Sequence, residues 1–107
     1  MTSKPAARKA ATKYSLKFVP DAWREWQALD GSIKQALKPL LAKRLQNPHV
    51  PGALLHRELA SCYKIKLLKQ GYRLVYMVED DVLVVLVLSV GKRADSAAYL
   101  AATKRIK

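Results

Sequence analysis

The sequence predicts a single α+β domain with the element order β-α-α-β-β-β-α. Residues 14–19 and 62–90 show the alternating or short apolar runs that are typical of strands, whereas residues 20–46 repeat apolar side chains at helical spacing. Half of the 107 residues are hydrophobic, which is enough material for one core. We therefore expect an antiparallel sheet core that packs against two N-terminal helices, with a third helix at the C-terminus.

The first 13 residues form a basic extension that contains four cations and no acid. Such a segment lacks the apolar surface that folding requires, so we expect disorder there and a folded domain over residues 14–107. An organelle transit peptide has a similar composition and is the alternative interpretation. The segment YSLKFV at 14–19 alternates as a short strand, which Pro20 ends.

Two helices are predicted before the remaining strands. The first begins at residues 20–21, and its apolar stripe includes Trp23 and Trp26, both of which are expected in the core. The second covers about 32–46, where Pro39 predicts a kink or a break. Basic residues lie largely off the apolar stripe of this second helix and make its outer face basic: Lys34, Lys38, Lys43 and Arg44.

The segment CYKIKLLKQGYRLVYMVE reads as a hairpin with a two-residue loop, Gln70-Gly71. This loop makes Arg73 a diagonal neighbour of Lys66. Because successive strand residues alternate between faces, Lys64, Lys66 and Arg73 are expected to share one face of the sheet. Apolar residues that should pack against the helices fall on the other face: Tyr63, Ile65, Leu67, Tyr72, Leu74, Tyr76 and Val78.

A second short turn at residues 80–81 brings the apolar strand at 82–90 back antiparallel. Its far end then lies beside Arg73, so Lys92 and Arg93 are expected to emerge near the same edge. Charges on an open sheet face are often merely solvated. Clustered cations without acids, however, cost stability and lower one another's proton affinity, which favours a binding or catalytic surface.

The overall charge indicates a polyanionic partner. Twenty Lys and Arg against eight Asp and Glu give a net charge of +12, and nucleic acid is favoured because the longest apolar run is too short to cross a bilayer. The single Cys62 cannot form an internal disulfide and no export signal is evident, which predicts a cytoplasmic protein. His49 and His56 lack acidic or cysteine neighbours at ligand spacing, so neither a metal nor another cofactor is expected.

The segments CYKIKL, GYRLVY and SVGKR, followed by a helix at 94–106 that carries Tyr99, closely resemble the RelE toxins. These are ribosome-dependent mRNA interferases of toxin–antitoxin pairs, and the resemblance implies a compact RelE-like fold. It implies a catalytic set with one role for each residue: Lys64 as general base, Lys66 and Arg73 as stabilisers of the scissile phosphate, Arg93 as general acid or phosphate stabiliser, and Tyr99 as a stacking partner for a codon base. Lys92 and the basic face of the second helix would hold RNA.

By this resemblance the ribose 2′-hydroxyl attacks the adjacent phosphate of a codon in the ribosomal A site, which leaves a 2′,3′-cyclic phosphate and a 5′-hydroxyl. Lysine is a poor base at its usual pKa, so Lys66 and Arg73 are expected to lower the pKa of Lys64, and the ribosome must orient the message. The resemblance also implies a RelB-like antitoxin that represses the shared operon together with the toxin. We expect the antitoxin to displace the weakly packed last helix.

Two alternatives remain open. ParE-like toxins share the fold and act on DNA gyrase, but they generally lack the lysine–arginine–tyrosine set. A nonenzymatic nucleic-acid-binding co-repressor would use the same cations only to contact phosphates.

Overall fold

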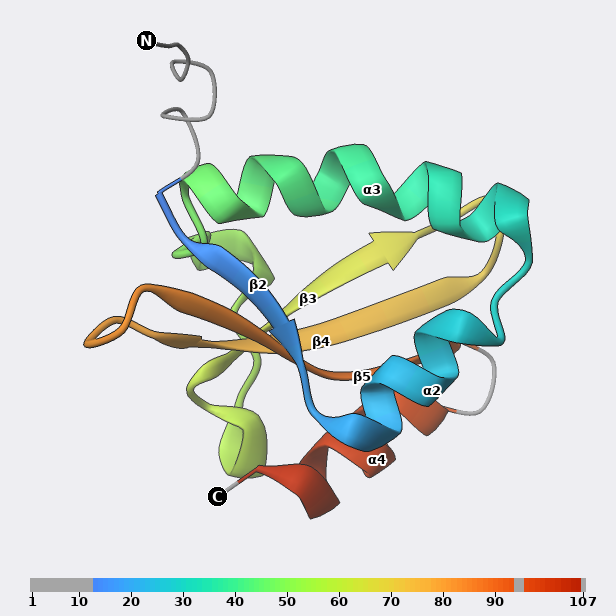
Figure 1. Ribbon diagram of the computed structural model, residues 1–107. Coiled ribbons are helices and arrows are strands. Elements are labelled where there is room, and N and C mark those ends of the chain that lie inside the picture. The colour runs from blue at the N-terminus through green and yellow to red at the C-terminus, as the bar shows by residue number, and fades with distance from the viewer. Residues whose placement is uncertain (1–12, 94–95, 107) are drawn as a thin grey trace, which may run out of the picture.

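The computed structural model describes residues 13–93 and 96–106. Within them the chain forms β2 (Ser15–Phe18), α2 (Pro20–Gln27), α3 (Gly31–Gln46), β3 (Cys62–Leu67), β4 (Tyr72–Glu79), β5 (Val84–Lys92) and α4 (Ala97–Arg105) (Figure 1). Two 3-10 turns, η1 (Pro51–Ala53) and η2 (Arg57–Leu59), connect α3 to β3. The predicted order β-α-α-β-β-β-α is confirmed. The predicted basic extension, apart from Lys13, lies outside the described residues.

The strands form one mixed sheet in the spatial order β2-β5-β4-β3. β3, β4 and β5 pair antiparallel, as predicted, whereas β2 runs parallel to β5. β2 and β3 are therefore the two edge strands. The hairpin that carries the predicted cations lies at the edge opposite to β2.

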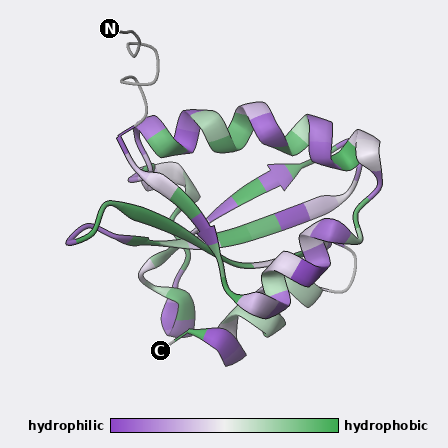
Figure 2. Ribbon diagram, viewed as in Figure 1, coloured by the Kyte–Doolittle hydropathy of each residue, from purple (hydrophilic) through white to green (hydrophobic). Residues whose placement is uncertain are grey.

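The helices α2 and α3 cover one face of the sheet and form the larger core with it. The strand residues predicted for this face all lie in or against that core: Tyr63, Ile65, Leu67, Tyr72, Leu74, Tyr76 and Val78. The central strands are accordingly largely hydrophobic, whereas α3 alternates between hydrophobic and hydrophilic residues along its length (Figure 2).

A smaller core lies on the other face of the sheet, where α4 packs across β5 and part of β4. Ala98 and Ala102 of α4 are buried against Val75 and Leu88. The small alanine side chains let the helix approach the sheet closely. α4 covers only part of this face, which leaves the part near β3 free for the predicted cations.

Two expectations about the helices are corrected. Trp26 is buried in the core, but Trp23 is 46% exposed. The rings of Trp23 and Phe18 pack edge to face, with their centroids 5.2 Å apart. Helix α3 runs unbroken through Pro39, which points to solvent. Burial of Leu37 on the opposite side of the helix holds α3 against the sheet and offsets the lost backbone hydrogen bond.

Over residues 13–93 and 96–106, none of the helices combines the length and the apolar character needed to span a membrane.

Candidate active site

The cationic patch is built on the β3–β4 hairpin. Lys66 pairs directly with Arg73, and Lys64 pairs with Val75. Paired residues of antiparallel strands project to the same face, with Cβ atoms about 4.5–5.5 Å apart. Lys64, Lys66 and Arg73 therefore share one face of the sheet, as predicted.

The hairpin turn is longer than predicted. Residues 68–71 connect the strands, instead of a two-residue loop, and Gly71 adopts a φ of +74° while its amide donates to the Leu67 carbonyl. The longer turn shifts the pairing by two positions, which keeps every residue on its predicted face because side chains alternate with a period of two. The shift makes Arg73 the direct partner of Lys66 rather than its diagonal neighbour.

A β-bulge in β5 decides which of the later cations joins the patch. The pairing with β4 shifts by one residue at Leu88, which has no partner on β4. Beyond the bulge Arg73 pairs with Gly91, so strand alternation directs Arg93 toward the cationic face. Lys92 falls on the helix-covered face instead. The sequence predicted both cations near this edge. Adjacent strand residues point to opposite faces, and the bulge sets which of the two joins the patch.

Tyr99 reaches the patch from α4. The guanidinium carbon of Arg73 lies 4.4 Å from the centroid of the Tyr99 ring, a cation–π contact. The Nε atom of Arg73 is buried and has no hydrogen-bond partner among the described residues. Arg73 is thus held by the ring and keeps a donor that no residue of the described ranges uses.

The electrostatics of the patch centre on Lys66. The charge of Lys64 lowers the pKa of Lys66, and partial desolvation and the charges of Arg73 and Arg93 lower it further. None of these four cations has a carboxylate within 4.0 Å in the part of the chain that the structure describes. Sequence reasoning assigned the lowered pKa to Lys64, but Lys66 has the more central position between the other charges.

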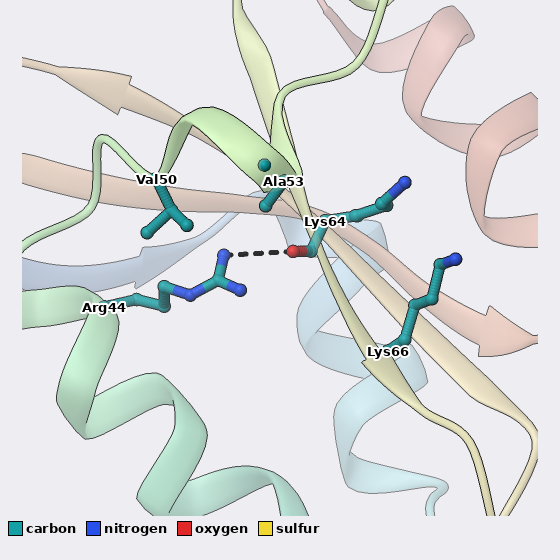
Figure 3. Close-up of a pocket in the computed structure, with 6 residues that line it drawn as sticks. Arg44, Val50, Ala53, Lys64 and Lys66 are labelled. Carbon is teal, nitrogen blue, oxygen red and sulfur yellow. Dashed lines mark hydrogen bonds between the residues drawn. The ribbon is translucent and has the colours of Figure 1, made fainter.

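The basic residues of α3 do not act as one group. Lys34, Lys38 and Lys43 lie on α3, which packs against the face opposite to the cationic patch. Arg44 departs from the predicted outer face. Its Nη1 donates to the Lys64 carbonyl at 3.0 Å (Figure 3) and also to the Tyr76 hydroxyl at 2.9 Å. Arg44 therefore reaches the backbone of a predicted catalytic residue from the next layer of the fold.

An ion pair that sequence reasoning missed fastens α4 to the domain. Arg105 donates two hydrogen bonds of 2.9 Å to the Glu25 carboxylate and one of 2.8 Å to the Leu88 carbonyl. Glu25 also accepts a hydrogen bond from the Val90 amide. Both backbone groups lie beyond Val87, the last residue of β5 that pairs with β2. The ion pair thus supplies hydrogen-bond partners to backbone groups of β5 that lie beyond the end of β2.

A second missed cluster surrounds His49, which was expected to be a simple surface residue. Its Nε2 lies 2.9 Å from Asp80 Oδ1 and its Nδ1 lies 3.1 Å from the Tyr63 hydroxyl. Tyr14 donates to the same Asp80 oxygen, and this bond, followed by the one from His49, lowers the pKa of Asp80. No short sequence motif encodes this cluster, because its members come from four separate segments.

The arrangement can bind and polarise a phosphodiester. Lys66, Arg73 and Arg93 offer positive charge to phosphoryl oxygens, and the Tyr99 ring offers an aromatic surface to a base. Across residues 13–93 and 96–106, no three side chains of His, Cys, Asp or Glu are grouped as a metal site would need.

Comparison with known proteins identifies the family. Residues 16–97 match the family model described as the ParE toxin of the type II toxin-antitoxin system, parDE. The mRNA interferase toxin RelE of Escherichia coli strain K12 is 45% identical over 93 residues, which cover 87% of this chain and 97% of that protein. The mRNA interferase RelE of Shigella flexneri gives the same values.

Solved structures agree with these matches. A double mutant of E. coli toxin RelE in the free state aligns with a TM-score of 0.79 at 43% identity, covering 89% of this chain and 99% of that chain. The intact E. coli RelBE toxin-antitoxin complex gives a TM-score of 0.70 at 44% identity, covering 74% of this chain and 95% of that chain. The chain therefore belongs to the RelE-type mRNA interferase toxins of the RelE/ParE superfamily.

Proposed function

We propose that the protein is a ribosome-dependent endoribonuclease that cleaves mRNA in the ribosomal A site and so inhibits translation. The observation that carries the proposal is the uncompensated cation cluster, with Lys66 opposite Arg73 and with Tyr99 against Arg73. The names of the RelE relatives, which are 45% identical and are called mRNA interferases, support it.

In the proposed reaction the 2′-oxygen of a ribose gives up its proton and bonds to the adjacent phosphorus. The bond from phosphorus to the 5′-oxygen breaks, and the 5′-oxygen takes up a proton, which leaves a 2′,3′-cyclic phosphate and a 5′-hydroxyl. Arg73 and Lys66 stabilise the charge on the phosphoryl oxygens, and Arg93 either assists them or protonates the leaving oxygen. Tyr99 positions a codon base by stacking.

Lys64 is the proposed general base. The lowered pKa of Lys66 makes that residue a second candidate, because a lysine that holds its proton less tightly is deprotonated in a larger fraction of molecules. A lysine side chain is largely protonated near neutral pH and therefore serves poorly as a proton acceptor. Much of the rate must therefore come from orientation of the message, and this is the physical reason for the proposed dependence on the ribosome. Lys34, Lys38, Lys43 and Lys92 are proposed to contact ribosomal RNA.

A RelB-type antitoxin is the proposed partner in the cytoplasm. E. coli toxin RelE has been solved in complex with an antitoxin RelBc peptide, and that toxin aligns here with a TM-score of 0.72 at 43% identity. The net charge of +12 suits an acidic wrapping segment. We further propose that the antitoxin takes the place of α4, and that the toxin–antitoxin complex represses its own operon at operator DNA.

A gyrase-directed toxin is the second candidate function, because the matching family model is that of the ParE toxin. The two functions make opposite predictions in one assay. An mRNA interferase cuts ribosome-bound message, whereas a gyrase-directed toxin or a nonenzymatic co-repressor leaves it intact.

The deciding experiment maps 5′ ends of mRNA on programmed ribosomes incubated with the protein. We expect new 5′ ends within the A-site codon, and a loss of about 10²–10³ in cleavage rate for Arg73→Ala and for Lys64→Ala, because each removes a group at the reacting centre. Lys17→Ala, on the distant strand β2, is the charge-matched control and should keep the parental rate. Intact message with the parental protein rules out the proposed function, and parental rates in both site variants rule out the proposed site.

A further inference from the structure

Arg44 is held in one orientation by acceptors that carry no charge. Its Nη1 uses both of its protons, one toward the Lys64 carbonyl at 3.0 Å and one toward the Tyr76 hydroxyl at 2.9 Å. The Tyr76 hydroxyl is itself fixed, because it donates to the Pro48 carbonyl at 2.8 Å. Tyr76 is fully buried, so the guanidinium rests on a rigid support.

The other edge of the same guanidinium is free. Among the described residues, nothing accepts a hydrogen bond from Nε or Nη2 of Arg44, and no carboxylate lies within 4.0 Å of it. This edge presents two parallel N–H groups, the geometry with which arginine binds phosphate bidentately. A partly buried positive charge without a counter-ion favours the approach of an anion.

Arg44 lines a hollow that is also lined by two lysines of the cationic patch. The hollow has a volume of about 370 Å³, near the lower end of the range for small-ligand pockets. Its lining comes from the end of α3, the turn η1 with the residue before it, and strand β3. It includes three cations and no carboxylate. The lining residues are Arg44, Val50, Gly52, Ala53, Lys64 and Lys66.

The three cations that line the hollow come from two elements, Arg44 from α3 and the two lysines from β3. In Figure 3 the side chains of Lys64 and Lys66 extend from β3 in a common direction, while Arg44 reaches the strand backbone from α3. Because the lysine side chains extend away from Arg44 (Figure 3), a single phosphate is poorly placed to use all three cations. Two successive phosphates of one strand can use them, one at the lysines and one at Arg44.

We propose that this hollow is a second phosphate-binding subsite, in which Arg44 holds a phosphodiester of single-stranded RNA next to the phosphate bound by Lys66 and Arg73. The proposal rests on the proposed function for the position of that neighbouring phosphate. Arg44 acts here as a substrate-positioning residue, since it fixes the strand on one side of the bond that is cleaved.

The test measures binding without ribosomes and without cleavage. The probe is a fluorescently labelled, short oligoribonucleotide with 2′-O-methyl riboses, which lacks the attacking hydroxyl, and its Kd is determined by anisotropy at several salt concentrations. Arg44→Gln should weaken binding about tenfold, as expected for the loss of a charge-assisted bidentate contact. The slope of log K against log salt should become shallower by about 0.7, the value for one phosphate contact on a single strand.

Two further variants separate charge from folding. Gly52→Glu places a carboxylate on the wall of the hollow, where a new Cβ meets nothing within 4 Å, and should weaken binding without touching the support of Arg44. Lys17→Gln removes the same charge from β2 at the other edge of the sheet and should leave the salt slope unchanged. Melting temperatures of all variants control for loss of fold.

The outcomes distinguish this subsite from the proposed function. Folded Arg44→Gln and Gly52→Glu variants that bind the probe with the parental Kd and salt slope would overturn the subsite, whatever the enzyme does on ribosomes. Weakened binding in both variants supports it, even if the parental protein leaves ribosome-bound message intact and the proposed function fails.

Discussion

Replacement of Arg105 by alanine should release α4 from the rest of the domain. The variant removes all three hydrogen bonds that join this helix to Glu25 and to the Leu88 carbonyl. The Glu25 carboxylate is then left with the Val90 amide as its hydrogen-bond partner. α4 keeps its packing through two buried alanines, so the helix should still form but open more often.

The magnitude follows from the burial of the pair. The side chains of Arg105 and Glu25 are 20% and 32% exposed, so the pair lies between a fully buried one, whose disruption costs about 3–5 kcal/mol, and a surface pair worth about 0–1 kcal/mol. We take about 2 kcal/mol for the loss. If that loss falls on the docking of α4 alone, the opened population rises about 30-fold.

Hydrogen exchange of the α4 amides measures this opening. In Arg105→Ala they should exchange about 30-fold faster, while amides of β4 keep the parental rate. Lys104→Ala, an exposed neighbour in the same turn, is the control and should change neither. If the antitoxin takes the place of α4, it should also bind Arg105→Ala more tightly, because less of its binding free energy is spent on opening the helix.

Two results would refute this reasoning. Parental exchange of α4 in Arg105→Ala would show that the ion pair does not hold the helix. An equal acceleration in α4 and β4 would show that the pair stabilises the whole domain rather than the docking of one helix. Stronger protection of α4 in the antitoxin complex would separately exclude displacement.

Three more predictions concern single side chains. Titration by NMR should give Lys66 a pKa below that of an isolated lysine. Because this pKa is lower in the folded state than in the unfolded state, the free energy of unfolding should increase as pH rises through the folded-state value. An unshifted pKa would contradict the clustering of the cations. Asp80 has a lowered pKa through its bonds to Tyr14 and His49, so it should stabilise the fold above the ordinary carboxyl pKa of about 3.8 and lose that effect as pH falls; Asp80→Asn should remove this pH dependence from urea unfolding. Pro39→Ala should raise the free energy of unfolding by about 1–3 kcal/mol, because the exposed proline breaks a helical hydrogen bond and contributes no core contact; an unchanged value would show that α3 has already relaxed around it.

The sequence was sufficient for the element order and for the face that each hairpin residue occupies. The hairpin illustrates why: the predicted loop was too short by two residues, yet Lys66 and Arg73 remained on one face, because an even shift preserves alternation. A bulge is an odd shift, and nothing in the apolar run of β5 marks its position. The sequence therefore did not show which of Lys92 and Arg93 joins the patch.

The remaining misses share one physical cause. Arg44 and Arg105 act through acceptors on distant segments, and a helical pattern shows which way a residue faces but not what it meets there. Trp23 was assigned to the core by its spacing from Trp26, but α2 is short and buries little more than one line of side chains. Such contacts are properties of the assembled layers and can be read only from the structure.

The parallel pairing of β2 with β5 has a consequence for the order of events during synthesis. Strand β2 cannot pair until β5, the last strand of the described residues, has been made, and Glu25 must wait for a residue 80 positions later. The sheet therefore cannot be completed while the chain is still being elongated through β5. Chains whose early segments pair with one another can fold progressively during synthesis. Tyr99 cannot dock beside Arg73 until α4 has been made. In a toxin built in this way, the proposed active site is assembled only after β5 and α4 have been synthesised.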